Sequence, residues 1–394
     1  MSIYNKAYEI CVNKIKSNIG KLKNSFKEYH ATLDGNYFGE DNMTTEFLSK
    51  WSWTQSFFTG MALLAYITEG DSRYIKWINE HFDLYKAKVF DLEMETMHDL
   101  GFLYSPYSVG IYKINGDINN RRVAIKAADE LAKRFVFNGG YINAWAQMNE
   151  KDNFTVGLAI IDCMMNLPLL FWAWEQTGND FYKDIATRHA DITLKYIVRP
   201  DWSVYHAYRF DPETGKPLGG TNHCGFSDES YWARGTSWAI YGFAVAYSYT
   251  KNEEYLNASI KLSEKFIENL PEDYIPVWDF RLPKETPAIA CGGQEYQKWD
   301  EKDKNNIKYN RDSSASAIAC CGFLELLNYT DNNTISNAVD RILNNLCSDI
   351  YFNEDINTPG VLKCSNGNMT YTVYGDYYFM EALYRKNGGK LRFW

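Results

Sequence analysis

One pattern recurs along this chain and restricts its possible folds more than any other feature. An apolar, aromatic-rich stretch runs into a short turn of Gly, Asn and Asp, and a charged amphipathic stretch follows. Gly and Asn end helices in the left-handed conformation and Asp or Ser begins the next helix, so each turn predicts a connection between two helices. The turns read TEGDSRY (68–74), INGDINN (114–120), QTGNDFY (176–182), YTKNEEY (249–255) and NYTDNNT (328–334).

The stretches on the two sides of these turns form two classes. Those before the turns are apolar nearly all round, which predicts helices buried on every side, and they span 57–67, 100–114, 160–175, 237–250, 314–329 and 377–384. Their partners carry charge on one face and span 5–26, 74–88, 121–135, 181–198, 253–269 and 335–346.

This alternation predicts two concentric rings of helices, an all-α (α/α)6 six-hairpin barrel, or toroid. We expect a single catalytic domain over 1–394, in which 1–34 supplies an outer helix and a lead-in. A linear solenoid is the alternative. The N-terminal helix could pair with the last inner helix, however, and so close the ring.

Composition and charge exclude several classes of protein. Hydrophobic residues make up 45% and charged residues 23% of the chain, which excludes general disorder. The net charge of -9 argues against a nucleic-acid or anionic-membrane partner. Aromatic residues reach 16%, which suits a protein that stacks rings on a ligand. No protein partner is indicated.

The expected compartment is the cytoplasm. Charges interrupt residues 1–16, so we expect no export signal there, and the apolar window 158–174 is too short and too polar to span a bilayer. The eight cysteines have no paired spacing. Their distribution predicts reduced, mostly buried thiols and no zinc site.

If the inner helices run parallel, the residues that open them meet at one mouth of the barrel. These openings read WSWTQSFF (51–58), MHDLGF (97–102), AIIDCMMN (159–166), YWARGTSW (231–238), RDSSASA (311–317) and VYGDYYF (373–379). They bring Trp, His, Asp and Arg together, and helix N-termini favour an anionic ligand. The combination is typical of a site for a sugar that carries an acid group.

Each candidate carboxylate also has a structural interpretation. Asp99 and Asp312 could be helix caps, since Asp is a favoured residue at that position. Asp162 lies between Ile161 and Cys163, where a carboxylate needs a partner or a raised pKa. A raised pKa is what a general acid requires, so we favour a functional role for Asp162.

The other polar candidates have alternatives as well. Arg234 could form an ion pair with Asp228 or Glu229, and the neighbouring Trp residues could belong to the core. Three histidines fall on amphipathic or linker stretches and are expected at the surface (His30, His81, His189). Three others lie beside the openings (His98, His206, His223). Their spacing matches no familiar metal site, so no metal and no cofactor are predicted.

Several of these motifs together resemble a known family. WTQSFFTG, HDLGFLYSPYSVG, IDCMMNLPLLFWAW, GFSDESYWARGTSWAIYGFAVAY and DSSASAIACCGFLEL are similar to the unsaturated glucuronyl hydrolases, glycoside hydrolase family 88. The resemblance runs in order from about residue 35 to the C-terminus. It implies a six-hairpin α/α barrel acting in the cytoplasm on oligosaccharides that polysaccharide lyases leave, whose non-reducing uronic acid has a C4=C5 double bond.

The resemblance also implies roles for single residues. Asp162 corresponds to the general acid/base that protonates C4 before water adds at C5, and Asp99 to a second essential carboxylate. The implied substrate-binding residues are Trp53 and Trp238 as stacking platforms, His98, His206 and Arg234 as polar contacts, Phe57 and Trp145 as lining, and Gly220, Asn222, His223 and Cys224 in the stretch GGTNHCGFSD.

Two departures from the family pattern bear on the substrate. Family members tend to have Gln where Cys224 stands, so one hydrogen bond to the substrate is in question. Members that accept sulfate carry an Arg near His223 and a Ser/Lys motif near the C-terminus. The region here reads KCSNGNMTYTVYGD without that motif, so we expect unsulfated or weakly sulfated substrates.

Three other functions remain open at this point. An unsaturated rhamnogalacturonyl hydrolase on the same barrel would keep the chemistry and change the substrate. An epimerase of the α/α-barrel type would rely on a pair of histidines instead. A non-catalytic carbohydrate-binding protein would need the aromatic residues but no acid, and the buried position expected for Asp162 argues against it.

Overall fold

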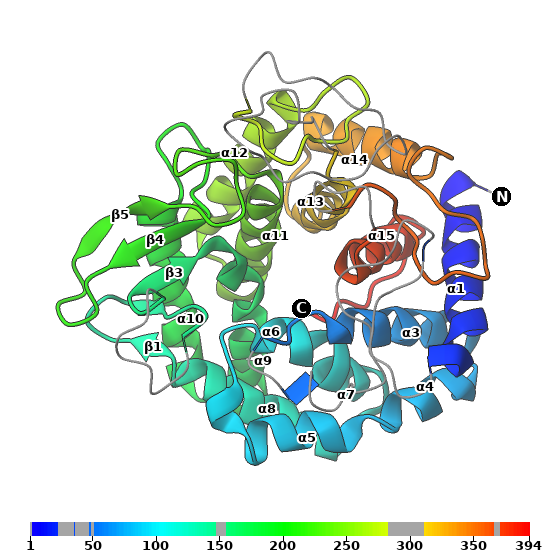
Figure 1. Ribbon diagram of the computed structural model, residues 1–394, viewed down its shortest axis with the longest axis horizontal. Helices are drawn as coiled ribbons and strands as arrows, with labels where there is room; N and C mark the ends of the chain where they lie inside the picture. Colours follow the sequence, from blue (N-terminus) through cyan, green and yellow to red (C-terminus); the bar gives the residue numbers. More distant parts are fainter. Residues whose placement is uncertain are drawn as a thin grey trace, which may run out of the picture.

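The computed structural model describes residues 2–22, 35, 47–48, 51–146, 155–282, 311–365 and 371–394, in which helices predominate. Figure 1 shows them as an inner ring surrounded by outer helices. The inner elements are α3 (Gln55–Glu69), α6 (Leu100–Tyr104) with α7 (Gly110–Asn115), α9 (Leu167–Thr177), α11 (Ala233–Thr250), α13 (Ser313–Leu326) and α15 (Val373–Lys386). The outer elements are α1 (Ile3–Leu22), α4 (Ser72–Asn79) with α5 (Phe82–Phe90), α8 (Ile118–Ala132), α10 (Asp180–Ile192), α12 (Glu253–Glu268) and α14 (Asn333–Leu346).

The inner ring is closed. Each inner element contacts the next along the chain, and α15 packs against α3. The outer helix α1 packs against both α15 and α3, as it must in a ring whose first outer helix pairs with the last inner one (Figure 1). The predicted (α/α)6 toroid is therefore confirmed, and the linear solenoid is wrong.

The predicted turns explain how one hairpin leads into the next. In three of them a glycine ends the inner element in the left-handed region, with φ of 68°, 74° and 69° at Gly70, Gly116 and Gly178. The next residue is Asp or Asn, and its side chain caps the outer helix that follows. At the first turn, for example, the Asp71 carboxylate accepts a hydrogen bond from the Arg73 N–H.

Two inner stretches differ from the expected continuous helices. A π-helical turn, η2 (Ser105–Val109), separates α6 from α7, because Pro106 has no N–H for the regular helical ladder. The stretch expected to begin at residue 160 starts instead with strand β3 (Leu158–Ile160), followed by a 3₁₀ helix, η3 (Ile161–Met165), before α9. The outer stretch 74–88 is likewise divided, into α4 and α5.

Short strands interrupt the helical pattern on one side of the barrel. The strands β1 (Phe135–Val136) and β2 (Tyr141–Ile142) form a hairpin. The strands β3, β4 (Ala207–Phe210) and β5 (Pro217–Thr221) form an antiparallel sheet, in which Ile160 pairs with Ala207 and Ala207 with Thr221. This sheet fixes the segment that follows His206.

Two expectations about buried residues need correction. His81 and His189 are buried rather than at the surface, because His81 packs edge-on against Trp77 and His189 Nδ1 accepts a hydrogen bond from the Ile142 N–H. His30 lies outside the described residues. Six cysteines are free thiols, as expected, but Cys364 is disulfide-bonded.

None of the described helices combines the length and the apolar character that crossing a bilayer would need.

Candidate active site

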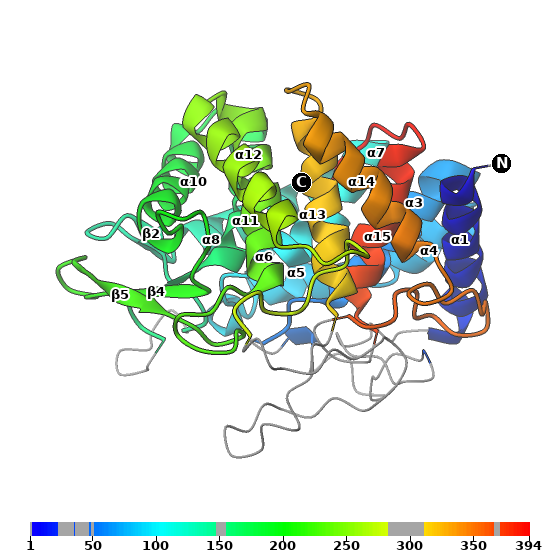
Figure 2. The same cartoon turned by 90° about the horizontal axis from the view of Figure 1, so that it is seen from above.

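The six openings of the inner elements meet at one end of the barrel and form a ring of contacts. Trp53 stacks on Tyr374 with ring centroids 5.2 Å apart, and Asn166 donates to Asp99 across 3.1 Å. Arg234 forms an ion pair of 2.8 Å with an aspartate at the start of α13. Figure 2 shows α11, α13 and α15 standing side by side above this end. The predicted meeting of the openings is therefore confirmed.

Asp99 occupies the N-cap position of α6, but its side chain makes no capping hydrogen bond. Its Oδ1 instead accepts from Asn166 Nδ2 and lies 3.3 Å from His98 Nε2. Burial, together with the negative charge of Asp162, raises the pKa of Asp99 to about 8. Asp99 is thus a buried carboxyl that keeps its proton at neutral pH, and not a cap.

His98 is held in one tautomer by the neighbouring chain. Its Nδ1 accepts a hydrogen bond of 3.2 Å from the Trp145 backbone N–H, and burial lowers its pKa well below the usual value. The neutral ring therefore carries its proton on Nε2, which faces Asp99. Trp145 adopts a positive φ of 58°, an unusual conformation for a bulky residue.

Asp162 begins η3 and is paired in the same way with His206. The Asp162 Oδ2 lies 3.4 Å from His206 Nε2, and His206 Nδ1 accepts from the backbone N–H groups of His223 and Cys224 at 3.1 and 3.0 Å. Because Nδ1 accepts from two backbone N–H groups, it carries no proton, and the neutral ring has its proton on Nε2, on the side of Asp162.

The loop after β5 supplies the amide groups that hold His206. Gly220 lies in β5 opposite Tyr208, and the Asn222 Oδ1 accepts from the Cys224 N–H at 3.1 Å. The Cys224 thiol is free and exposed. The His223 ring packs edge-on against Trp145 at 5.0 Å, so this loop and the Trp145 segment meet over the two His–Asp pairs.

Arg234 is buried at the start of α11 and pairs with Asp312, not with Asp228 or Glu229. The Asp312 carboxylate also caps α13 by accepting from the Ala315 N–H at 3.1 Å, so its predicted capping role is confirmed. The Arg234 guanidinium lies 4.4 Å from the Trp232 ring centroid. Burial alone would lower the pKa of this guanidinium, but the groups around it, Asp162 among them, raise it, so a buried cation lies near that carboxylate and is available to an anionic ligand.

Replacing Asp312 by Asn should destabilise the protein strongly, because the buried Arg234 would lose its counter-charge. Breaking a buried pair in this way costs about 3–5 kcal/mol. Urea unfolding should therefore show a clearly lower midpoint for Asp312→Asn than for the exposed control Asp331→Asn. Equal midpoints for the two variants would contradict this account of the pair.

The predicted aromatic residues lie at different depths. Trp53 is half-buried and borders the site beside Phe102 and Tyr374. Trp238 and Phe57 are fully buried and pack around the same Phe102. The structure thus places Trp53 at the surface of an aromatic cluster and the other two beneath it.

Two residues of the site were not singled out from the sequence. Asn166 bridges Asp99 and the Phe102 N–H, and it stands within the motif IDCMMN, which was the available signal. Arg134 is buried at the end of an outer helix and donates to the carbonyls of Thr96 and Ala146. It ties together the segments that carry His98 and Trp145, and no motif marks it.

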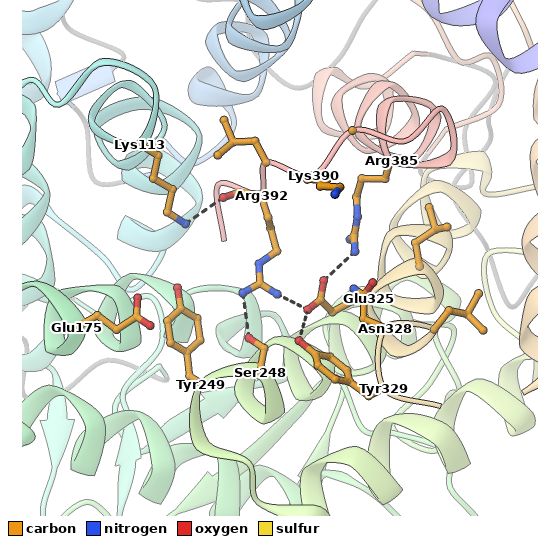
Figure 3. A pocket seen from close by; sticks show the side chains of 14 residues that line it. Lys113, Glu175, Ser248, Tyr249, Glu325, Asn328, Tyr329, Arg385, Lys390 and Arg392 are labelled. Carbon is orange, nitrogen blue, oxygen red and sulfur yellow. Dashed lines mark hydrogen bonds and ion pairs between the residues drawn. The ribbon is translucent and has the colours of Figure 1, made fainter. Parts of the chain in front are cut away.

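A cavity of about 810 Å3 opens at the other end of the barrel, where the inner helices finish (Figure 3). Several of its charged groups are paired with one another. Glu325 bridges Arg385 and Arg392, and Lys113 Nζ donates to the Arg392 carbonyl at 3.0 Å. Cations beside helix C-termini offset the helix dipoles, which accounts for the basic residues at this end of the barrel.

The site contains two carboxylates, each with a histidine Nε2 within 3.4 Å, near a buried arginine and a partly exposed aromatic face. Within the described ranges, no group of three or more His, Cys, Asp and Glu side chains is arranged to hold a metal ion. Paired carboxylates can deliver and accept protons, as they do in glycoside hydrolases, so this mouth of the barrel fits a carbohydrate-active hydrolase.

Comparison with known proteins agrees with this class. The family model for Glycosyl Hydrolase Family 88 matches residues 36–275. The chain is 34% identical over 396 residues to the unsaturated chondroitin disaccharide hydrolase of Streptococcus pyogenes serotype M1, an alignment that covers 96% of this chain and 90% of that protein. The chain therefore belongs to glycoside hydrolase family 88, as its motifs indicated.

Solved structures give the same result. The crystal structure of an unsaturated glucuronyl hydrolase from Streptococcus agalactiae matches with a TM-score of 0.85 at 30% identity, covering 100% of this chain and 94% of that one. The enzyme from Bacillus sp. GL1, described as responsible for the degradation of glycosaminoglycan, matches with a TM-score of 0.84 at 30% identity, covering 98% and 97%. The chain is thus a glycoside hydrolase built on the α/α barrel.

Proposed function

We propose that this glycoside hydrolase removes the Δ4,5-unsaturated glucuronic acid from the non-reducing end of glycosaminoglycan-type oligosaccharides produced by lyases. The observation that carries the proposal is the pair of carboxylates, the buried Asp99 and the partly buried Asp162, each with a histidine Nε2 within 3.4 Å. The relatives named above, which act on unsaturated chondroitin disaccharides or glycosaminoglycan, support this choice of substrate.

In the proposed reaction one carboxyl group adds a proton to C4 of the unsaturated sugar. Positive charge then develops at C5 and the ring oxygen, water adds at C5, and the resulting hemiketal opens and releases the neighbouring sugar. The carboxyl that gave the proton can take one from the attacking water, so a single group serves both steps. The carboxylate-spacing rule for ordinary glycosidases does not apply to this hydration.

The roles of Asp99 and Asp162 are assigned from how far each side chain is exposed. The charge of Asp162 adds to burial in raising the pKa of Asp99, so the pair disfavours the doubly charged state and keeps one proton near neutral pH. The Asp162 side chain is 16% exposed and that of Asp99 is 8% exposed. Asp162, the more exposed group, is therefore proposed as the general acid/base that delivers the single proton of the pair to C4. Asp99, which holds this proton in the free site, is proposed to become the carboxylate that holds sugar hydroxyls and supports the cationic transition state once the proton has moved.

The remaining candidates surround these two groups. Arg234 is proposed to bind the uronate carboxylate and Trp53 to stack on a sugar ring. Contacts to the sugar hydroxyls are proposed for His98 and His206, with the loop 220–224 and Trp145 as lining. Phe57 and Trp238, which are fully buried, are proposed to support this surface from beneath.

The proposed substrate is unsulfated or weakly sulfated. Cys224 offers a thiol where family members tend to have a Gln amide, and the sequence near the C-terminus has no recognisable Ser/Lys motif. A higher kcat/KM on a sulfated chondroitin disaccharide than on its unsulfated form would contradict this preference.

The experiment that tests the proposed function uses the ultraviolet band of the conjugated C4=C5 carboxylate. The purified protein, without added metal or cofactor, should remove this band from an unsaturated hyaluronan or chondroitin disaccharide. A stable band, together with turnover of pectin-derived unsaturated disaccharides, would replace the proposal by a rhamnogalacturonyl hydrolase. Inertness toward both would overturn the hydrolase chemistry proposed here.

We expect kcat/KM to fall as the pH rises through about 8. The catalytically competent pair holds one proton, and the raised pKa of Asp99 marks where that last proton is lost. Activity should be retained on the acid side of that value and lost on the alkaline side. The profile is measured between pH 5 and 10 with substrate well below KM, and a constant rate up to pH 10 would contradict this interpretation.

We also propose that residues 1–394 form a single catalytic domain that acts in the cytoplasm. The closed ring, whose last inner element packs against the first, supports a single domain. Six free thiols support a reducing compartment, while the disulfide at Cys364 counts against it.

A further inference from the structure

Asn166 lies at the junction of η3 and α9, fully buried beside Asp99. We infer that Asn166 is a positioning residue that determines which oxygen of Asp99 faces the substrate. This inference rests on the proposed function, because it assigns Asn166 a task in presenting one of the two carboxyl groups. Asn166 itself is expected to make no contact with the sugar.

The orientation of the Asn166 amide is fixed by a partner that can only donate. The backbone N–H of Phe102 lies 3.0 Å from Asn166 Oδ1, so the oxygen of the amide must be on that side. The Nδ2 group is consequently directed at Asp99 Oδ1, 3.1 Å away. The side chain cannot be turned over without losing both hydrogen bonds.

This bridge requires an unusually close approach of two inner elements. Gly101 lies in α6, two residues after Asp99, and packs against the Asn166 backbone. A Cβ atom at position 101 would overlap Asn166 Cα and lie 2.8 Å from Asn166 Oδ1. Glycine at this position therefore allows the amide to reach Asp99 and Phe102 together.

The consequence for Asp99 follows from which of its two oxygens is occupied. Its Oδ1 accepts a hydrogen bond from Asn166 Nδ2 at 3.1 Å, and His98 Nε2 lies 3.3 Å from the same oxygen without completing a hydrogen bond. A carboxyl group that already accepts through one oxygen places its own proton on the other oxygen. The hydrogen bond from Asn166 therefore keeps Asp99 Oδ1 in contact with the protein, and Asp99 Oδ2 stays available for the proton and the sugar hydroxyls.

A double-mutant cycle tests whether Asn166 acts through Asp99. We expect Asn166→Ala to lower kcat by about 10- to 100-fold, with KM changed far less, because the misoriented carboxyl fails mainly in the transition state. In an Asp99→Asn background the same substitution should cause no further loss. Losses that multiply in the double variant would overturn the inference.

A second measurement separates positioning from a general effect on packing. Asn166 lowers the pKa of Asp99 through its hydrogen bond, so its removal should move the Asp99 titration to higher pH. In Asn166→Ala the pH at which kcat/KM begins to fall, the alkaline limb of the profile, should therefore be higher than in the wild type. The control Asn120→Ala removes another buried amide, in α8, and should affect thermal stability without moving the limb.

The carboxyl titration can be followed without turnover. A ¹³C NMR titration of Asp99 should show the same upward shift in Asn166→Ala, or in Asn166→Ser if the alanine variant does not fold. An unchanged Asp99 titration would overturn the inference, whatever the activity. A wild-type protein inactive toward unsaturated disaccharides would contradict the proposed function alone, since the titration does not depend on that substrate.

Discussion

Replacing Asp162 by Asn should lower kcat by about 10²–10⁴-fold, the usual contribution of a positioned proton donor. The amide is isosteric with the carboxyl and can still face His206 Nε2, from which Asp162 Oδ2 is 3.4 Å away. Fold and substrate affinity should therefore survive. The loss is measured from the ultraviolet band at saturating substrate, and affinity is measured by calorimetry on the same variant.

The control is Asp184→Asn, an exposed carboxylate on the outer helix α10. It should retain wild-type turnover. Turnover of Asp162→Asn near that of the control would remove Asp162 from the role of general acid/base and leave Asp99 as the remaining candidate.

Replacing Asp99 by Asn should also abolish most activity, but it should stabilise the protein at alkaline pH. The folded-state pKa of Asp99 is about 8, while an unfolded Asp titrates near 3.9. Between these values the folded state binds more protons than the unfolded state, so wild-type stability falls as the pH rises toward 8. An Asn side chain does not ionise and escapes this loss.

Thermal unfolding of the two proteins at pH 5 and pH 8 measures the effect. We expect Tm of the wild type to drop more than that of Asp99→Asn between these conditions, and we expect the variant to be the more stable at pH 8. Melting of Asp99→Asn well below the wild type at both pH values would mean that the side chain supports the fold, as a helix cap would.

The fold could be predicted because its signals are local. Each Gly-Asp or Gly-Asn step ends one helix and starts the next within two residues, as at Gly70 and Asp71. Apolar character on all sides then distinguishes inner from outer helices. These features need no knowledge of distant contacts, so the order of the ring follows directly from the sequence.

The points at which a predicted helix is interrupted or contacts another element were harder to predict. The apolar run around Ile160 is compatible with a strand or a helix, and its pairing with Ala207, far away in the sequence, decides for the strand. His189 was expected at the surface because α10 is amphipathic. Its acceptor contact with the Ile142 N–H depends on a hairpin that the helical periodicity does not reveal.

The candidate site was predictable in its residue types but not in its pairings. The openings indicated that Arg234 and the carboxylates would meet, because all inner helices start at one end. The partner of Arg234 proved to be Asp312, 78 positions away, rather than a sequence neighbour. Pairings of this kind follow from the curvature of the ring, which the sequence pattern does not contain.

The closure of the ring also sets the order in which the site can assemble. Inner elements 55–69 through 313–326 each pack on a neighbour that is close along the chain, whereas residues 373–386 must join the first of them. Trp53 acquires its stacking partner Tyr374 only in that step. During synthesis the mouth of the barrel therefore stays incomplete until the last inner helix has docked, and a partly made chain has no finished sugar site to expose.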